Sequence, residues 1–127
     1  MSDHTTTVTT AAATVERYIA IWNETDAGRR RELVAEVFTP DAAYTDPLGS
    51  VEGHDGIDGF IGGAQAQFAG LTFSLPAAPD AHHDLARFQW HLSAPGGGEP
   101  LAIGFDVVEL VGGRISKVHG FLDKVPA

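Results

Sequence analysis

Residues 101–110 read LAIGFDVVEL, and the alternation in this stretch decides the class of fold. Successive side chains of a β-strand point to opposite faces, so Ile103, Phe105 and Val107 share one face. Asp106 lies on the other face, where a carboxylate is unusual because Asp is disfavoured in strands. Both faces are otherwise largely apolar. One face can pack against a layer of helices. The other face would leave apolar side chains in water, and we expect a second copy of the chain to bury it. The face of Asp106 also carries Ala102, Gly104, Val108 and Leu110.

The same period of two runs through the second half of the chain. It predicts strands at Thr72–Leu75, His82–Ser93, Leu101–Leu110 and Arg114–Lys124, separated by segments rich in Pro and Gly. In the strand expected at 82–93, alternation places Phe88 and Trp90 on one face with Ala86 and Leu92. In the strand expected at 114–124, Val118, Gly120 and Leu122 are expected to face the interior.

The first half of the chain has a helical period instead. Val15, Tyr18, Ile19 and Trp22 form one stripe at i, i+3, i+4 and i+7. A second helix follows Gly28, and a third is expected from a cap at Asp55 to about Gly70. The stretch 42–45 reads as short and extended, residues 1–12 as a flexible tail, and residues 13–127 as a single domain.

Helices followed by long antiparallel strands indicate the α+β class. We expect three helices packed on a strongly curved, mainly antiparallel sheet, with a conical apolar pocket between the two layers. At 127 residues, with 43% apolar and 20% charged residues, the chain is long enough for one core.

The net charge of −9 makes nucleic acid and anionic membranes poor partners, and no apolar run approaches the ~20 residues of a membrane span. The chain has no cysteine, which excludes disulfides and thiolate catalysis, and we expect a cytoplasmic protein. His82 and His83 are adjacent in an expected strand and point apart. His54 lies near Asp55 and Asp58, without the spacing of a zinc motif. We therefore expect no metal.

Three polar residues stand where a core would prefer none. Tyr18 lies in the inward stripe of the first helix, and Asp106 lies in the middle of a strand. Asp46 lies in YTDPLGS, residues 44–50, where Pro47 holds it in an extended conformation. Each also has a purely structural explanation. Asp46 can be a turn carboxylate bonded to nearby N–H groups, Tyr18 can be a core tyrosine, and Asp106 can be bonded to Tyr18.

The sequence resembles the ketosteroid isomerases. The matching pieces are ERYI at 16–19, FTPDAAYTDPLGS at 38–50, residues 56–61, and GFDVVELVGGRI at 104–115. The wider relatives are the nuclear transport factor 2-like superfamily, of cystatin-like fold, which includes the SnoaL-like polyketide cyclases. The resemblance covers most of the chain in element order but is close only in the first half.

The resemblance implies a role for each polar residue. Asp46 matches the general base that moves a proton next to a carbonyl group, while Tyr18 and Asp106 match the donors that hold the enolate oxygen. It implies no cofactor and a small hydrophobic carbonyl compound as ligand. The residues expected to contact that ligand are Trp22, Tyr44, His54, Phe60, Phe88, Trp90, Gly104 and Leu122.

Three alternatives stay open. In a SnoaL-like cyclase, Asp106 alone would serve as acid and base. The chain could instead be a non-catalytic ligand-binding or dimerisation module on the same fold. Epoxide hydrolysis ranks last, because it needs an Arg in the pocket and Arg87 has the wrong strand parity.

Overall fold

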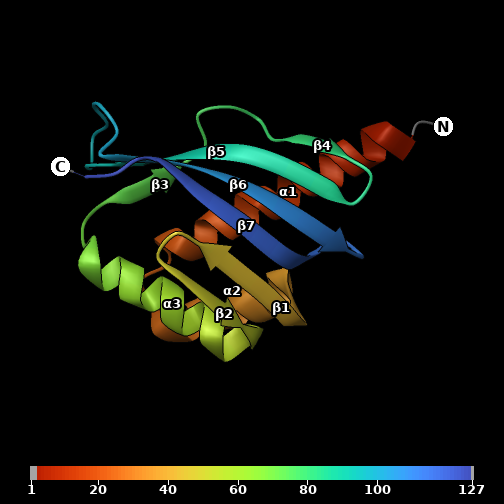
Figure 1. The fold of residues 1–127 in the computed structure, drawn as a ribbon, viewed down its shortest axis with the longest axis horizontal. Coiled ribbons are helices and arrows are strands. Elements are labelled where there is room, and N and C mark those ends of the chain that lie inside the picture. Colours follow the sequence, from red (N-terminus) through yellow and green to blue (C-terminus); the bar gives the residue numbers. More distant parts are fainter. Residues whose placement is uncertain (1–2, 127) are drawn as a thin grey trace.

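The computed structural model describes the backbone of residues 3–126 and the side chains of residues 10–126. Within this range three helices pack on a seven-stranded, mostly antiparallel sheet, which confirms the expected α+β class (Figure 1). The helices are α1 (Asp3–Asn23), α2 (Ala27–Val37) and α3 (Gly53–Gln67).

Helix α1 starts at Asp3 and not at Ala13 as expected, so residues 3–12 are helical. Threonines are weak helix formers, but tertiary packing overrides this preference. Ala11 is fully buried, and the Thr14 hydroxyl donates a hydrogen bond of 2.8 Å to the Gly113 carbonyl oxygen. The Thr14 bond ties α1 to the turn between β6 and β7. Residues 1 and 2 of the expected tail lie outside the described residues.

The stretch expected to be short and extended is a full hairpin. Strand β1 (Phe38–Asp46) pairs antiparallel with β2 (Gly49–Glu52), and Asp46 faces Gly49 across the turn. The Asp46 carboxylate accepts hydrogen bonds from the N–H groups of Leu48 and Gly49, which stabilise this turn. The following helix, α3, begins at Gly53, so Asp55 lies in its first turn and is not its cap.

The remaining strands are β3 (Thr72–Ser74), β4 (Asp80–His82), β5 (Leu85–Ser93), β6 (Ala102–Val111) and β7 (Arg114–Lys124). The strand expected at 82–93 is therefore two strands, because the chain turns at His83, which has a φ of 51°. The sheet order is β2-β1-β7-β6-β5-β3, with β4 also paired to β5. Strand β1 runs parallel to β7, which brings the hairpin of the first half beside the last strand.

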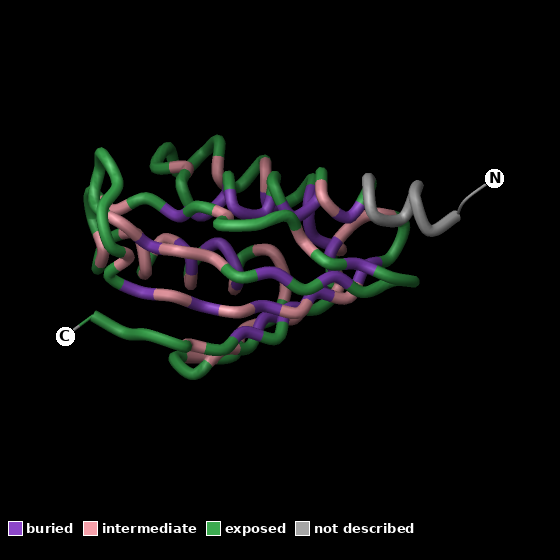
Figure 2. Tube along the Cα trace, turned by 90° about the horizontal axis from the view of Figure 1, so that it is seen from above, coloured by how far each residue is buried: buried purple, intermediate pink, exposed green. Residues whose placement is uncertain are grey.

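Strand parity separates a buried face from an outer face. On β6, Asp106 and its neighbours at every second position are buried, whereas Ile103, Phe105 and Val107 are partly exposed. On β7, Phe121 is 59% exposed on the outer side. Figure 2 shows this alternation of buried and more exposed residues along the strands. None of the helices within residues 3–126 is long and apolar enough to cross a membrane.

Candidate active site

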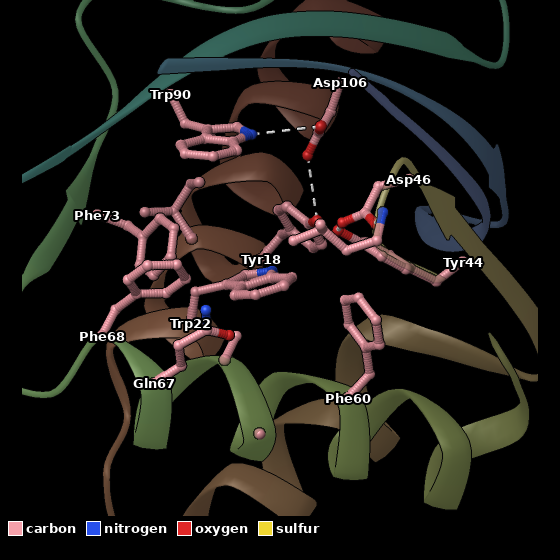
Figure 3. Close-up of a pocket in the computed structure, with 14 residues that line it drawn as sticks. Tyr18, Trp22, Tyr44, Asp46, Phe60, Gln67, Phe68, Phe73, Trp90 and Asp106 are labelled. Atoms are coloured by element: carbon pink, nitrogen blue, oxygen red, sulfur yellow. Dashed lines mark hydrogen bonds between the residues drawn. The ribbon is translucent and has the colours of Figure 1, made fainter. Parts of the chain in front are cut away.

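A cavity of about 350 Å³ lies between the sheet and helices α1 and α3 (Figure 3). Its walls are mostly aromatic and aliphatic, and its polar side chains come from α1, β1, β5, β6 and α3. This combination of an apolar wall with a few converging polar groups is typical of small-molecule sites. The lining residues are Tyr18, Ile19, Trp22, Tyr44, Asp46, Leu48, Phe60, Gly63, Ala64, Gln67, Phe68, Phe73, Trp90 and Asp106.

Asp106 is the most buried charged group of the cavity, with 3% of its surface exposed. Its carboxyl group accepts a hydrogen bond of 3.1 Å from the Tyr18 hydroxyl at Oδ2 and one of 3.3 Å from the Trp90 indole N–H at Oδ1. Both bonds are drawn in Figure 3. Tyr18 is itself 1% exposed, so α1 and β5 together hold this carboxyl group in the apolar interior.

Gly104 explains why Trp90 can lie beside Asp106. The two residues face each other across β5 and β6, and a Cβ at Gly104 would come within 2.0 Å of the indole ring. Such an approach is sterically forbidden, so only a glycine lets the indole lie on the strand. Gly104 therefore positions Trp90 and does not itself line the cavity.

Asp46 occupies the end of β1, where its two carboxylate oxygens have different partners. Oδ1 accepts the turn N–H groups of Leu48 and Gly49, at 2.7 and 3.1 Å. Oδ2 accepts the Tyr44 hydroxyl at 2.6 Å. The side chain is thus fixed at the cavity wall with one oxygen bound to the turn and the other to a tyrosine of the cavity.

The two carboxyl groups meet across three neighbouring strands. Asp106 on β6 pairs with Gly120 on β7, and Thr45, one residue before Asp46, pairs with His119. A Cβ at Gly120 would lie 3.0 Å from Asp106 Oδ1 and 3.1 Å from the Asp46 Cβ. A larger residue would have to push these side chains aside, so Gly120 is what lets both acids reach the same end of the cavity.

Burial determines the protonation of Asp106. Desolvation, with a smaller contribution from the negative charge of Asp46, raises the pKa of Asp106 from its ordinary value of 3.8 to about 7. The hydrogen bonds from Trp90 and Tyr18 act in the opposite direction. Burial, together with the charge of Asp106, also raises the pKa of Tyr18 and that of Tyr44 above the ordinary value of 10.0, so both phenols stay protonated at neutral pH.

The number of hydrogen-bond donors available to a ligand oxygen depends on whether Asp106 carries a proton. When Asp106 is ionised, the Tyr18 O–H and the Trp90 N–H both donate to it, and neither is free for a ligand oxygen. When Asp106 is protonated, its O–H adds one donor. That proton can bind a ligand oxygen directly, or bind Tyr18 and release the phenol proton. The group formed by Tyr18, Trp90 and Asp106 can therefore offer a donor to a developing oxyanion only when Asp106 is protonated. A further donor in the cavity is the buried indole N–H of Trp22, which has no hydrogen-bond partner among the described residues.

The structure brings together most, but not all, of the residues expected at the site. The three expected catalytic residues line one cavity, as do Trp22, Tyr44, Phe60 and Trp90. The remaining four expected ligand contacts lie outside the lining residues, namely His54, Phe88, Gly104 and Leu122.

Each of these four has another position. Phe88 is buried behind Tyr18, at 5.7 Å between ring centroids. Leu122 is partly exposed near the end of β7. The His54 Nε2 atom lies 3.1 Å from the carbonyl oxygens of Phe38 and Thr39, so that nitrogen carries a proton and donates to them. His54 faces a separate hollow of about 260 Å³ between α2 and α3, on the side away from the acids of the cavity.

The sequence analysis missed seven lining residues. Four of them follow Phe60 at i+3, i+4 and i+7 along α3 and at i+8 in its C-cap, so the helical period could have identified this face once Phe60 was placed inward. Leu48 lies in the hairpin turn and is 66% exposed, and Phe73 lies on the short strand β3, so neither carried a signal. The missed residues are Ile19, Leu48, Gly63, Ala64, Gln67, Phe68 and Phe73.

A buried polar cluster holds α3 in place behind this wall. The Arg30 guanidinium donates to Asp58 at 2.7 Å and to the side-chain oxygen Oε1 of Gln65 at 2.8 Å. The Gln65 amide in turn donates to the backbone oxygens of Trp22 and Glu24 at the end of α1. Asp58, one of the two acids near His54, is thus paired with Arg30. Among the described residues, no group of three or more His, Asp or Glu side chains is arranged to hold a metal ion.

The SnoaL-like domain family matches residues 15–118. A SnoaL-like family protein from Agrobacterium tumefaciens, provisionally described as an isomerase, is 42% identical over 91% of this chain and 98% of its own, with a TM-score of 0.85. A provisional ketosteroid isomerase from Kribbella flavida is 19% identical over 93% and 81%, with a TM-score of 0.68.

A provisional SnoaL-like polyketide cyclase from Jannaschia sp. CCS1 is 18% identical over 87% of this chain and 85% of its own, with a TM-score of 0.67. At these lower identities the likeness concerns the fold alone. No curated protein matches the sequence.

Proposed function

The chain belongs to the SnoaL-like domain family, and on this basis we propose that it catalyses cofactor-independent proton transfer on a small hydrophobic carbonyl compound. The observation that supports this function is the meeting of Asp46 with the Tyr18–Asp106 pair at one end of an aromatic cavity. A half-buried carboxylate beside a neutral acid is the arrangement that abstraction of a proton next to a carbonyl group requires.

In the proposed reaction, the ligand oxygen is bound by the proton that Asp106 shares with Tyr18. Asp46 takes a proton from the carbon next to the carbonyl group, and the electron pair of that C–H bond moves into an enolate. The negative charge on oxygen is stabilised by the buried donors. Asp46 then returns the proton to the far carbon of the conjugated system, so the atoms of the substrate are only rearranged.

The lining groups also suggest the charge of the substrate. Among the described residues that line the cavity, the ionisable groups of low ordinary pKa are Asp46 and Asp106, and none is Lys, Arg or His. An anionic substrate would be repelled by Asp46 and would find no counter-ion. A neutral ketone or enone suits these walls better than a carboxylic acid or a phosphate.

The test is the rise in ultraviolet absorbance when a β,γ-unsaturated ketosteroid becomes conjugated. We expect the wild type to turn over, and Asp46→Asn to lose at least about a hundredfold in rate, the low end for a general base. Asp123→Asn, which removes one exposed carboxylate, is the matched control and should keep the wild-type rate. Equal rates for wild type and Asp46→Asn would refute the assignment of Asp46 as base.

A non-catalytic binding module is the second candidate, and one observation favours it. Both oxygens of Asp46 already have hydrogen-bond partners, in the turn and at Tyr44, so the carboxylate has a structural role of its own. A protein that binds a phenol, as a mimic of the enolate, but converts no β,γ-unsaturated ketone would support this candidate.

The outer face of the sheet is the proposed partner surface. Phe105 and Phe121 are paired across β6 and β7 on this face, beside Ile103 and Val107. An apolar sheet face without cover is unfavourable in water, and closed symmetric pairs are the commonest way to bury one. We propose that two copies of the chain meet through this face, which leaves both cavities free on the opposite side.

A further inference from the structure

One face of α3 forms a wall of the cavity, and one of its positions has no side chain. Phe60, Gly63, Ala64 and Gln67 lie at i, i+3, i+4 and i+7, and all four line the cavity. Figure 3 shows Phe60 and Gln67 extending from this helix on either side of a bare segment. The backbone of α3 is therefore open to the cavity at Gly63.

Neither backbone conformation nor packing explains a glycine at this position. Gly63 lies in the interior of α3, where glycine lowers helix stability, and it has no positive φ. Beyond the helix's own turns, no described atom lies within 4 Å of a Cβ built there. By contrast, a Cβ at Gly62 would lie 3.0 Å from the Arg30 guanidinium, and one at Gly56 would lie 3.4 Å from Val51.

We propose that Gly63 is a specificity-determining residue, and that the space it leaves accommodates the wide part of a neutral, ring-bearing ligand. The proposal rests on the proposed carbonyl site, because it takes the ligand oxygen to be bound at Asp106 and the ring system to extend along α3. Trp22 and Phe60, which both line the cavity, pack edge to face at 6.4 Å between their ring centroids and form one aromatic wall. A flat apolar ligand matches such walls.

The size of the cavity supports this role. At about 350 Å³ it is at the small end of the range for ligand pockets, which is roughly 300–1,000 Å³. In so small a space one added methyl group changes which ligands fit. A difference of a single methylene in an apolar pocket changes affinity or rate by roughly 10–200-fold.

The test compares Gly63→Ala and Gly63→Leu with the same substitutions at Gly59. Gly59 lies in the same helix and matches Gly63 in being exposed and free of packing neighbours, but it does not line the cavity. Binding of phenol, with one ring, and 2-naphthol, with two rings, is measured at about pH 6 by quenching of tryptophan fluorescence. Both ligands are neutral enolate mimics with a single hydroxyl group.

We expect Gly63→Ala to weaken binding of 2-naphthol by about tenfold while phenol changes by less than about twofold, and Gly63→Leu to abolish binding of 2-naphthol. Both Gly59 variants should bind as the wild type does. Since alanine is the better helix former, Gly63→Ala and Gly59→Ala should each raise the unfolding midpoint by a few degrees. This increase would show that a loss of binding is not a loss of fold.

Three results would overturn the proposal. They are wild-type affinity for 2-naphthol in Gly63→Leu, an equal loss of both ligands in Gly63→Ala, or no binding of either ligand by the wild type. The last result would also refute the carbonyl site. The expected binding pattern in a protein that converts no ketosteroid would support the role of Gly63 and refute only the catalytic proposal.

Discussion

Replacing Asp106 with asparagine should make the protein more stable at alkaline pH, and the gain should depend on pH. Asparagine has nearly the same shape, and it can accept the Trp90 N–H with its oxygen and donate to the Tyr18 oxygen with its amide. The substitution therefore removes the ionisation of residue 106 and reproduces the hydrogen bonds of the protonated acid, in which residue 106 accepts from Trp90 and donates to Tyr18.

The direction of this change in stability with pH follows from the raised pKa of Asp106. Its folded value of about 7 exceeds its ordinary value of 3.8, so the folded protein binds this proton more tightly than the unfolded chain does. The stability from this proton is complete below about pH 4 and is lost as the pH rises from about 4 to about 7. At about 1.4 kcal/mol for each pKa unit, the wild type loses roughly 4 kcal/mol in this window, and the Asn variant does not.

The assay is urea unfolding of wild type and Asp106→Asn, followed by circular dichroism, at several pH values from about 4 to about 8. The difference in unfolding free energy between the two proteins should shift in favour of Asp106→Asn by a few kcal/mol as the pH rises. Asp123→Asn controls for the loss of one acidic group from a chain of net charge −9. A difference that stays constant within about 1 kcal/mol over this range would refute the inference that the fold holds Asp106 as a neutral acid.

Two further predictions concern the framework and the partner surface. Arg30→Met should lower the unfolding free energy by about 3 kcal/mol, because it removes the close cation of the buried Asp58 and leaves only Arg31, at 3.8 Å. Arg29→Met, which breaks an exposed pair with Glu32, should cost less than about 1 kcal/mol, and equal losses in urea unfolding would contradict the role of the buried cluster. Phe121→Asp should convert the expected dimer into a monomer, as measured by light scattering coupled to size-exclusion chromatography. The control Val125→Asp, which lies beyond the end of β7, should stay dimeric, and a monomeric wild type would refute the outer-face interface.

Local patterns of the sequence predicted much of the framework. Alternation in residues 102–110 identified β6 and the face on which Asp106 is buried, and the stripe containing Tyr18 and Trp22 identified the inward side of α1. These features depend on the helix and strand periods, which act over a few residues. The start of α1 was misplaced because the threonines before Ala11 are weak helix formers, and a propensity of this kind does not decide where a helix begins in the folded chain.

The residues of the candidate site were likewise predictable only in part from local sequence patterns. Sequence parity and the Asp-Pro turn were enough to single out Tyr18, Asp46 and Asp106, because an acid or a phenol on an apolar face is conspicuous within a single element. His54 and Leu122 were misplaced, because the cavity's outline depends on where α3 and the end of β7 lie in space. Phe73 was missed for the same reason, whereas Gly63 lies three residues after Phe60 and was within reach of the helical period.

The sequence by itself therefore determined which residues point inward, since that follows from periods of two and 3.6 residues. Only the tertiary structure decided which inward residues meet. Asp46 and Asp106 lie sixty residues apart in the chain and come together because β1 pairs in parallel with β7, while Gly120 leaves no side chain between them. A contact of this kind depends on strand order and register, which are set by the packing of the whole sheet and not by any single stretch of sequence.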